Sequence, residues 1–247
     1  HVSEPTVVRF CRAVGCDGVQ NFKVALAQHV AHSGEYAAVD YRDDDSARQY
    51  TFKVFDATME ALKCVRDSIE VDAIEKAVEL LGNARRVEFY GFGASGAVAS
   101  DAQHKFFRLQ VSTAAYSDPH MQAMSAVTLG PQDVAVAISQ TGHTKDLLHS
   151  AALVAETGAT LICLCPSQTP LAELGSIHIA IDVTEDTDIY TPLSSRIAHL
   201  VVIDVLAMGM AMRRGPELVN HLKNVKRSLR GLRLTHKAGQ KAADSQD

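Results

Sequence analysis

The 247-residue sequence has five cysteines but no C-x-x-C pair and no cluster of cysteine with histidine. The lack of such pairs argues against a structural metal, and the odd number of cysteines argues against a disulfide framework. Cys163 and Cys165 alternate within an apolar stretch, where small buried thiols are common. We therefore expect a protein of the reducing cytoplasm that holds neither a metal nor a cofactor.

The sequence also lacks an apolar run near the roughly 18 residues that a membrane-spanning helix needs. Its first residues lack the charged and then apolar pattern of a secretory signal. Apolar residues make up 47% and charged residues 21%, which is an ordinary globular composition rather than a disordered one. We expect no membrane partner, and a chain long enough for one large domain or two small ones.

The net charge of −5 conceals a basic segment at residues 213–237. This segment has eight lysines and arginines and a single acidic residue, Glu217. A basic helix face can contact nucleic acid, but a solvated surface is at least as good an interpretation. The segment alone does not decide between them.

Residues 134–145, VAVAISQTGHTK, form the most informative motif. The first five residues are apolar and predict a buried parallel strand, while residues 147–155 have helical spacing with Thr144 as the N-cap. The turn between them is rich in hydroxyl groups and contains Gly142. Backbone N–H groups at a helix start, together with short hydroxyls, favour a bound phosphate. The motif therefore predicts a loop that binds a phosphorylated sugar or sugar acid.

A second glycine-rich turn, GFGASG at residues 91–96, follows a strand expected at residues 87–90 and precedes a helix expected at residues 97–109. The glycines match the G-x-G-x-x-G spacing of dinucleotide-binding proteins. That fingerprint also needs an acidic residue at the end of the next strand, about twenty residues on. No acidic residue ends that strand itself, which argues against a dinucleotide, but Asp118 lies close to that place. The dinucleotide interpretation is therefore rejected only in combination with the second loop, at residues 139–144.

Alternating strands and helices predict an α/β fold, with a five-stranded parallel sheet flanked by helices in a three-layer sandwich. The ligand is expected at the carboxyl ends of the strands, where both glycine turns fall. A long apolar helix at residues 191–212 is either a subunit interface or a buried core helix. The five expected strands are residues 87–90, 111–116, 134–138, 160–165 and 177–183.

Residues 1–32 predict the C-terminal part of a helix-turn-helix domain. A short helix closed by Gly15 has the arginines and hydroxyls that suit a major groove, and a second helix follows at residues 22–30. The earlier helices of such a domain have no counterpart, so we expect a truncated domain that binds DNA poorly. The other expected segments are a linker at 33–49, a ligand-binding domain with its leading helices at 50–237, and a tail at 238–247. The leading helices are expected at residues 50–66 and 71–81, the second one capped by Asp67 or Ser68.

Taken together, the turns at residues 91–95 and 139–144 resemble the two phosphate-binding turns of the sugar isomerase (SIS) domain. Residues 194–204, SSRIAHLVVID, and the front segment 2–15, VSEPTVVRFCRAVG, resemble the RpiR/MurR family of bacterial sugar-phosphate-responsive transcriptional regulators. The resemblance covers essentially the whole chain. It implies double-stranded DNA as a partner, a homodimer or larger assembly and, in the hexose-catabolism branch, 2-keto-3-deoxy-6-phosphogluconate as the effector.

The resemblance also supplies expected site residues. Those expected to bind the effector are Gly93, Ser95, Ser139, Gln140, Thr141, Gly142, Thr144 and Ser194. Those expected to contact DNA are Ser3, Thr6, Arg9 and Arg12.

SIS domains also serve isomerases that interconvert ketose and aldose phosphates, a reaction that needs a positioned base. No motif singles out such a base; His143 can simply bond the effector, and Glu185 lies in an acidic loop that we expect to be solvated. The groove-reading front helix favours a regulator without catalytic residues over an isomerase. The candidate bases are His104, His120, His143, Glu173, Glu185 and His199.

Overall fold

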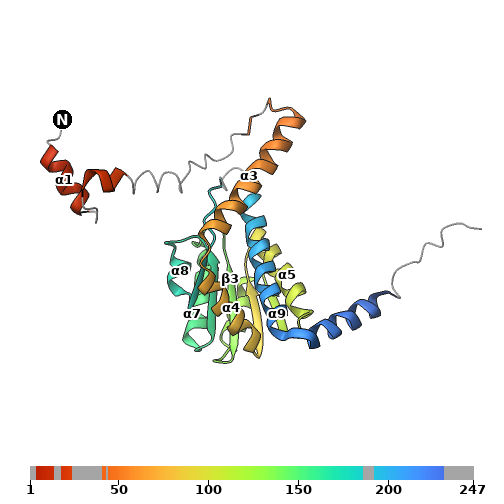
Figure 1. Cartoon of the computed structure of the whole chain (residues 1–247). Helices are drawn as coiled ribbons and strands as arrows, with labels where there is room; N and C mark the ends of the chain where they lie inside the picture. Colours follow the sequence, from red (N-terminus) through yellow and green to blue (C-terminus); the bar gives the residue numbers. More distant parts are fainter. Residues whose placement is uncertain (1–3, 14–17, 24–40, 43, 186–191, 231–247) are drawn as a thin grey trace, which may run out of the picture.

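A five-stranded sheet forms the centre of the computed structural model, which describes residues 4–13, 18–23, 41–42, 44–185 and 192–230 (Figure 1). The strand order is β2-β1-β3-β4-β5, and every neighbouring pair is parallel. The winding reverses after β2, so β1 and β3 are neighbours at the switch point of the sheet. The strands are β1 (Arg86–Tyr90), β2 (Ser112–Tyr116), β3 (Asp133–Ile138), β4 (Thr160–Cys165) and β5 (Ile177–Ala180).

Helices cover both faces of the sheet, which confirms the predicted three-layer α/β sandwich. One core contains buried side chains such as Leu81, Phe89 and Phe106, and the other contains Tyr90 and Leu147. Successive strand residues serve opposite cores because side chains alternate along a strand. The first face is covered by α4 (Val71–Asn83), α5 (Gly93–Phe107) and α9 (Ser194–Arg230), and the second by α6 (Pro119–Ala126), α7 (Lys145–Glu156) and α8 (Pro170–Leu174).

Helix α3 (Ala47–Ser68) packs along α9 and continues past the end of the sheet (Figure 1). It begins three residues before the predicted end of the linker, because Ser46 and Gln49 form a capping box that starts the helix early. Helix α4 has Glu70 at its N-cap, without a side-chain capping bond, so the prediction of Asp67 or Ser68 as its cap is wrong.

Helix α9 begins at Ser194 and is interrupted at Gly215, whose φ of 63° lies in the left-handed region. By length and composition, its part Ser194–Pro216 is apolar enough to cross a membrane, contrary to the sequence expectation. A core helix of a globular domain meets the same criterion, and Ala198, Ile203 and Leu206 are fully buried against the sheet. The helix therefore has a core role, while Met208 and Met212 are exposed.

The front of the chain contains the predicted helix, α1 (Glu4–Ala13), and a second helical stretch at residues 19–23. Phe10 and Phe22 join the two in an edge-to-face contact, with ring centroids 5.6 Å apart. The rest of the second predicted helix, the predicted linker up to residue 40 and the tail lie outside the described residues.

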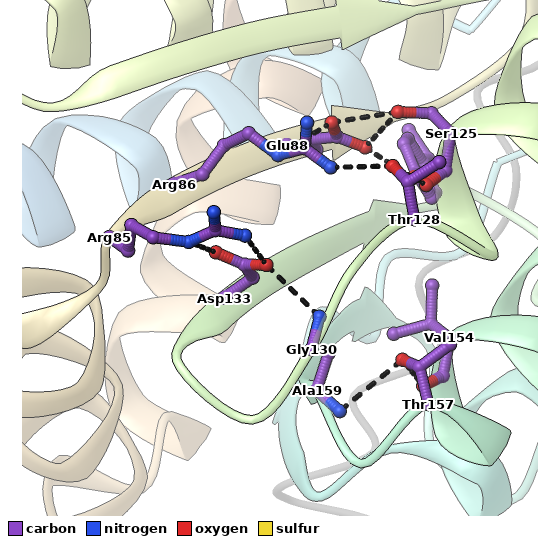
Figure 2. A network of polar contacts seen from close by, with 11 residues as sticks. Arg85, Arg86, Glu88, Ser125, Thr128, Gly130, Asp133, Val154, Thr157 and Ala159 are labelled. Carbon is purple, nitrogen blue, oxygen red and sulfur yellow. Dashed lines mark hydrogen bonds and ion pairs between the residues drawn. The ribbon is translucent and has the colours of Figure 1, made fainter.

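A polar network joins the starts of β1 and β3 and extends beneath α6 (Figure 2). Arg85 donates from Nε and Nη2 to the two oxygens of Asp133, at 2.9 and 2.6 Å. Fully buried Glu88 accepts from the Ser125 hydroxyl at 2.8 Å and from the Tyr90 hydroxyl at 2.5 Å. Burial, and then the Glu88 carboxylate, raise the pKa of the Tyr90 phenol far above its usual range, so Tyr90 stays a neutral donor. This network ties α6 to the sheet.

Candidate functional site

The two predicted loops lie next to each other at the carboxyl edge of the sheet. Strands β1 and β3 are paired in parallel, with Tyr90 opposite Ala137, so the segments that follow them leave the sheet side by side. The segment after β1 leads into α5, and the segment after β3 leads into α7. In open α/β sheets, ligands bind in the crevice at such a switch point.

Helix α5 begins at Gly93, four residues earlier than predicted, so Gly93 and Ser95 both belong to its first turn. The early start follows from close packing rather than from helix propensity. A Cβ on Gly91 would lie 2.6 Å from the Ser95 carbonyl oxygen, and one on Gly96 would lie 2.6 Å from the Ser117 hydroxyl. The chain turns tightly enough only with glycine at these positions, which brings the backbone N–H groups of the first turn to the edge of the sheet.

Ser139 and Gly142 determine the shape of the loop after β3. The buried Ser139 hydroxyl accepts from the Gly142 N–H at 2.9 Å, and the Ser139 N–H donates to the Leu164 carbonyl at 3.0 Å. Gly142 has a φ of 66°, and a Cβ there would lie 2.3 Å from the Thr169 hydroxyl oxygen. The loop is therefore held in one conformation by β4 on one side and by the start of α8 on the other.

The remaining residues of this loop leave polar groups available at its surface. Thr141 is exposed, and Thr144 is the N-cap of α7, as predicted, but its side chain makes no capping bond. Gln140 donates from Nε2 to the Val183 carbonyl at 3.3 Å, while its buried Oε1 has no hydrogen-bond partner among the residues that the structure describes. An unpartnered buried acceptor is costly and needs an explanation.

Side-chain capping separates the helices that follow the five strands into two groups. Asp118 caps α6 by accepting from Met121 N–H at 2.9 Å, and Thr169 caps α8 by accepting from Ala172 N–H at 3.4 Å. The Glu185 carboxylate closes the start of α9. Helices α5 and α7, which flank the switch point, begin without any side-chain capping bond. Their first-turn N–H groups remain available to an anion.

Glu185 is not solvated as predicted. Its carboxylate accepts from the backbone N–H groups of Leu193, Ser194 and Ser195 at 2.6, 2.9 and 3.3 Å, and also from the Ser195 hydroxyl. The carboxylate therefore neutralises the positive end of the helix dipole. The sequence around Glu185 does not distinguish it as a cap from the acidic residues beside it. Its hydrogen-bond partners follow eight to ten residues later.

The structure places the other predicted residues as follows. Ser194 starts α9, and its hydroxyl lies 3.4 Å from that of Thr58 in α3, so it faces the leading helix. Thr6 is exposed on α1, whereas Ser3 and the side chains of Arg9 and Arg12 lie outside the described part of the chain.

The structure places the six candidate bases in different surroundings. His104, His120, His143 and Glu173 are exposed, and Glu185 is used as a cap. His199 is buried, and both of its ring nitrogens face backbone carbonyls. Within the described ranges, no group of three or more His, Cys, Asp or Glu side chains is placed to hold a metal ion.

Two domain families match this chain. The SIS domain matches residues 80–209, and the helix-turn-helix domain of the rpiR family matches residues 1–33. The fold and the switch-point loops thus belong to a SIS domain that follows a DNA-binding domain.

The transcriptional regulator HexR of Escherichia coli K12 is 45% identical over 230 residues, which cover 93% of this chain and 80% of that protein. The chain therefore belongs to the RpiR family of HTH-type transcriptional regulators. The SIS match covers more than half of the chain, and the rpiR helix-turn-helix match lies at the predicted position. These matches confirm the family resemblance found in the sequence.

Solved structures show the same fold. Vibrio vulnificus NanR in complex with ManNAc-6P has a TM-score of 0.70 at 24% identity, covering 94% of this chain and 83% of that chain. A Methanococcus jannaschii protein with an inferred function of 3-hexulose-6-phosphate isomerase has a TM-score of 0.56 at 14% identity, covering 70% and 97%. The fold is thus shared by a protein solved in complex with ManNAc-6P and by one with an inferred isomerase function.

Proposed function

We propose that the two switch-point loops bind the phosphate of a sugar acid, 2-keto-3-deoxy-6-phosphogluconate, and that this binding modulates the affinity of the full-length regulator for DNA. The observation that carries the proposal is the pair of uncapped helix starts, α5 and α7, since the helices after the other three strands, α6, α8 and α9, are all capped by side chains. Both helices follow neighbouring strands, so two dipole ends and their N–H groups are available at this edge of the sheet for an anion.

The loop hydroxyls complete this phosphate site. The Ser139 oxygen accepts from Gly142 N–H, which leaves the Ser139 hydroxyl proton to donate to a phosphate oxygen. Ser95 in the first turn of α5, with Thr141 and Thr144 in the loop before α7, adds three further hydroxyls. Gly93 and Gly142 let the backbone approach closely, and we also assign Ser194, at the start of α9, to the effector site.

Gln140 gives the site a means of choosing among phosphorylated ligands. Its Oε1 atom is a buried acceptor without a partner, and a hydroxyl of the bound sugar acid would supply the missing donor. A ligand without a hydroxyl at that place would leave the acceptor unsatisfied. The phosphate end provides affinity, and Gln140 contributes to specificity.

The same geometry supports regulation rather than catalysis. The candidate bases are exposed, buried between carbonyls, or engaged as a cap. The alternative, an aldose–ketose isomerase, is favoured only by the fold that it shares with an inferred isomerase. We place the protein in the cytoplasm, where DNA and sugar phosphates are both present.

A homodimer gives the regulator two helix-turn-helix domains (heads) that can contact DNA. Val201, Val205, Met208 and Met212 are spaced along one side of α9 and are 42, 43, 62 and 75% exposed. We assign this apolar stripe to the contact with a second copy. A change in head spacing between effector-bound and free dimers would couple effector and operator binding reciprocally, by typically about 1–3 kcal/mol.

Calorimetry with 2-keto-3-deoxy-6-phosphogluconate, fructose 6-phosphate and arabinose 5-phosphate tests this function. We expect the sugar acid phosphate to bind most tightly and none of the three to be converted. Turnover of either sugar phosphate would establish the isomerase instead. Equal affinity for all three, matched by inorganic phosphate, would remove the assignment of the effector.

A further inference from the structure

His199 lies in the first turns of α9 with only 2% of its surface exposed. Its Nδ1 atom is 2.8 Å from the Ser195 carbonyl oxygen in the same helix. Its Nε2 atom is 3.3 Å from the Leu164 carbonyl oxygen in β4. The imidazole ring therefore bridges the start of α9 and the carboxyl end of the sheet.

A neutral imidazole has one N–H and cannot donate to both carbonyls at once. Burial lowers the pKa of His199, against the opposing effect of the two carbonyls, so the ring is neutral near pH 7. Two tautomers are then possible, and each leaves one nitrogen lone pair facing a carbonyl oxygen. The shorter contact is to Ser195, so this conformation favours the proton on Nδ1.

The two competing carbonyls belong to different parts of the protein. The Leu164 carbonyl also accepts from the N–H of Ser139, the first residue of the phosphate loop, at 3.0 Å. Ser195 belongs to the turn that Glu185 caps, and the adjacent Ser194 hydroxyl lies 3.4 Å from that of Thr58 in α3. One carbonyl is thus tied to the loop after β3, and the other to the helix start that contacts the leading helix.

We propose that His199 is a positioning residue that couples the phosphate loop to α9 through a change of tautomer. The coupling rests on the proposed function, because it needs a ligand on the Ser139 loop. A ligand that draws the Ser139 N–H away from Leu164 leaves that carbonyl in need of a donor. The His199 proton then moves to Nε2 to supply it, and the Ser195 carbonyl loses its bond from the ring. The ring thereby exchanges a bond inside α9 for a donated bond to β4, and the Ser194–Thr58 contact carries the resulting shift of the first turn to α3.

Two amide variants separate the two hydrogen bonds. The side-chain nitrogen of asparagine can occupy the place of Nδ1, and that of glutamine the place of Nε2. His199→Asn keeps the bond to Ser195 and should bind 2-keto-3-deoxy-6-phosphogluconate about five- to tenfold more weakly than wild type. His199→Gln keeps the bond to Leu164 and should bind it at least as tightly as wild type. Equal affinities of the two variants would contradict the coupling.

Nitrogen-15 NMR of the wild-type imidazole provides a readout that needs no variant to fold. We expect the Nδ1–H form without ligand and the Nε2–H form at saturation with 2-keto-3-deoxy-6-phosphogluconate, with inorganic phosphate as the second probe. An unchanged tautomer in a saturated protein would overturn the coupling and leave the proposed function intact. Failure of the wild-type protein to bind either probe would overturn both.

Discussion

At the amino end of the sheet, Arg85 and Asp133 satisfy each other through two hydrogen bonds, whereas at the carboxyl end α5 and α7 begin without side-chain caps. Both ends bring backbone and side-chain polar groups close together. At the amino end, donors meet acceptors within the chain, including the Gly130 N–H, which donates to Asp133 at 3.0 Å (Figure 2). At the switch point, the donors point to where a ligand is expected.

The carboxyl edge itself repeats this contrast on a smaller scale. Helices α6, α8 and α9 start at the same edge as α5 and α7, yet Asp118, Thr169 and Glu185 close their first turns. A capped helix start contributes to stability, typically by about 1 kcal/mol. The lack of caps at α5 and α7 therefore costs stability that a bound anion can restore. The unsatisfied backbone N–H donors of these two helices indicate where the anion binds.

The largest effect is expected from Gly142→Ala. The φ of 66° is unfavourable for alanine, and the added Cβ would lie 2.3 Å from the Thr169 hydroxyl oxygen, so the loop must move. We expect a loss of about 1–3 kcal/mol in unfolding free energy. Effector affinity should fall by about a hundredfold or more, because the donors are displaced. Denaturant unfolding and calorimetry measure the two effects.

Gly130→Ala is the matched control, because a Cβ at Gly130 would meet nothing within 4 Å and the residue lies at the amino end of the sheet. It should bind effector like the wild-type protein. A Gly142→Ala protein that binds normally would show that the loop conformation is irrelevant to the site.

Ser139→Ala removes one hydroxyl from the phosphate loop at the carboxyl end of the sheet. We expect effector binding to weaken by roughly 1.5–3 kcal/mol, since the hydroxyl donates to a charged group. The control is Ser150→Ala, which also removes a buried hydroxyl from this layer; that hydroxyl donates to the Asp146 carbonyl within α7. Calorimetry that finds the same affinity in both variants would refute the role of Ser139.

Asp133→Asn tests whether the ion pair at the amino end of the sheet makes stability depend on pH. The bond from Arg85 lowers the pKa of Asp133 below its usual 3.8, despite the opposing effect of burial. The charged form therefore stabilises the fold above the unfolded pKa, and this stabilisation is lost as pH falls through the folded pKa. The Tm of the wild-type protein should exceed that of Asp133→Asn near neutral pH, and the gap should narrow below about pH 4.

Effector affinity at neutral pH should be the same in Asp133→Asn and the wild-type protein, because the ion pair lies at the opposite end of the sheet. A Tm gap that stays constant down to about pH 3, below the ordinary aspartate pKa, would show that charge at Asp133 is unimportant for stability.

Local patterns sufficed to predict the strands and both loops, because an apolar run followed by a glycine turn depends on neighbours in the sequence. The start of α5 was missed, since Gly93 resembles a turn residue until the packing of Gly91 against Ser95 is known. The cap on α9 was missed for another reason: Glu185 meets its partners across a loop, and an acidic cluster looks solvated.

Long-range contacts were hidden from the sequence for the same reason. The buried Glu88 interrupts an otherwise apolar strand, but its partner Ser125 comes from α6, 37 residues later. His199 and Leu164 are separated by 35 residues, so the bridge between α9 and β4 exists only in the folded chain. The role of a charged or imidazole side chain depends on its neighbours in the folded structure, and the spacing of apolar residues in the sequence does not reveal those neighbours.

The smallest change in stability, and the most direct test of the contrast between capped and open helix starts, is expected from Thr144→Asp. An aspartate at this N-cap can accept from the first-turn N–H groups of α7, as Asp118 does for α6. Unfolding free energy should rise by about 0.5–1 kcal/mol. The same carboxylate would occupy the phosphate site and repel the phosphate, so effector affinity should fall while the fold becomes more stable.

Thr144→Ser, which keeps a hydroxyl and adds no charge, should leave the unfolding free energy and the effector affinity near their wild-type values. Thermal unfolding with and without effector measures them together, and a Thr144→Asp variant that still gains stability from the effector as wild type does would place the phosphate elsewhere.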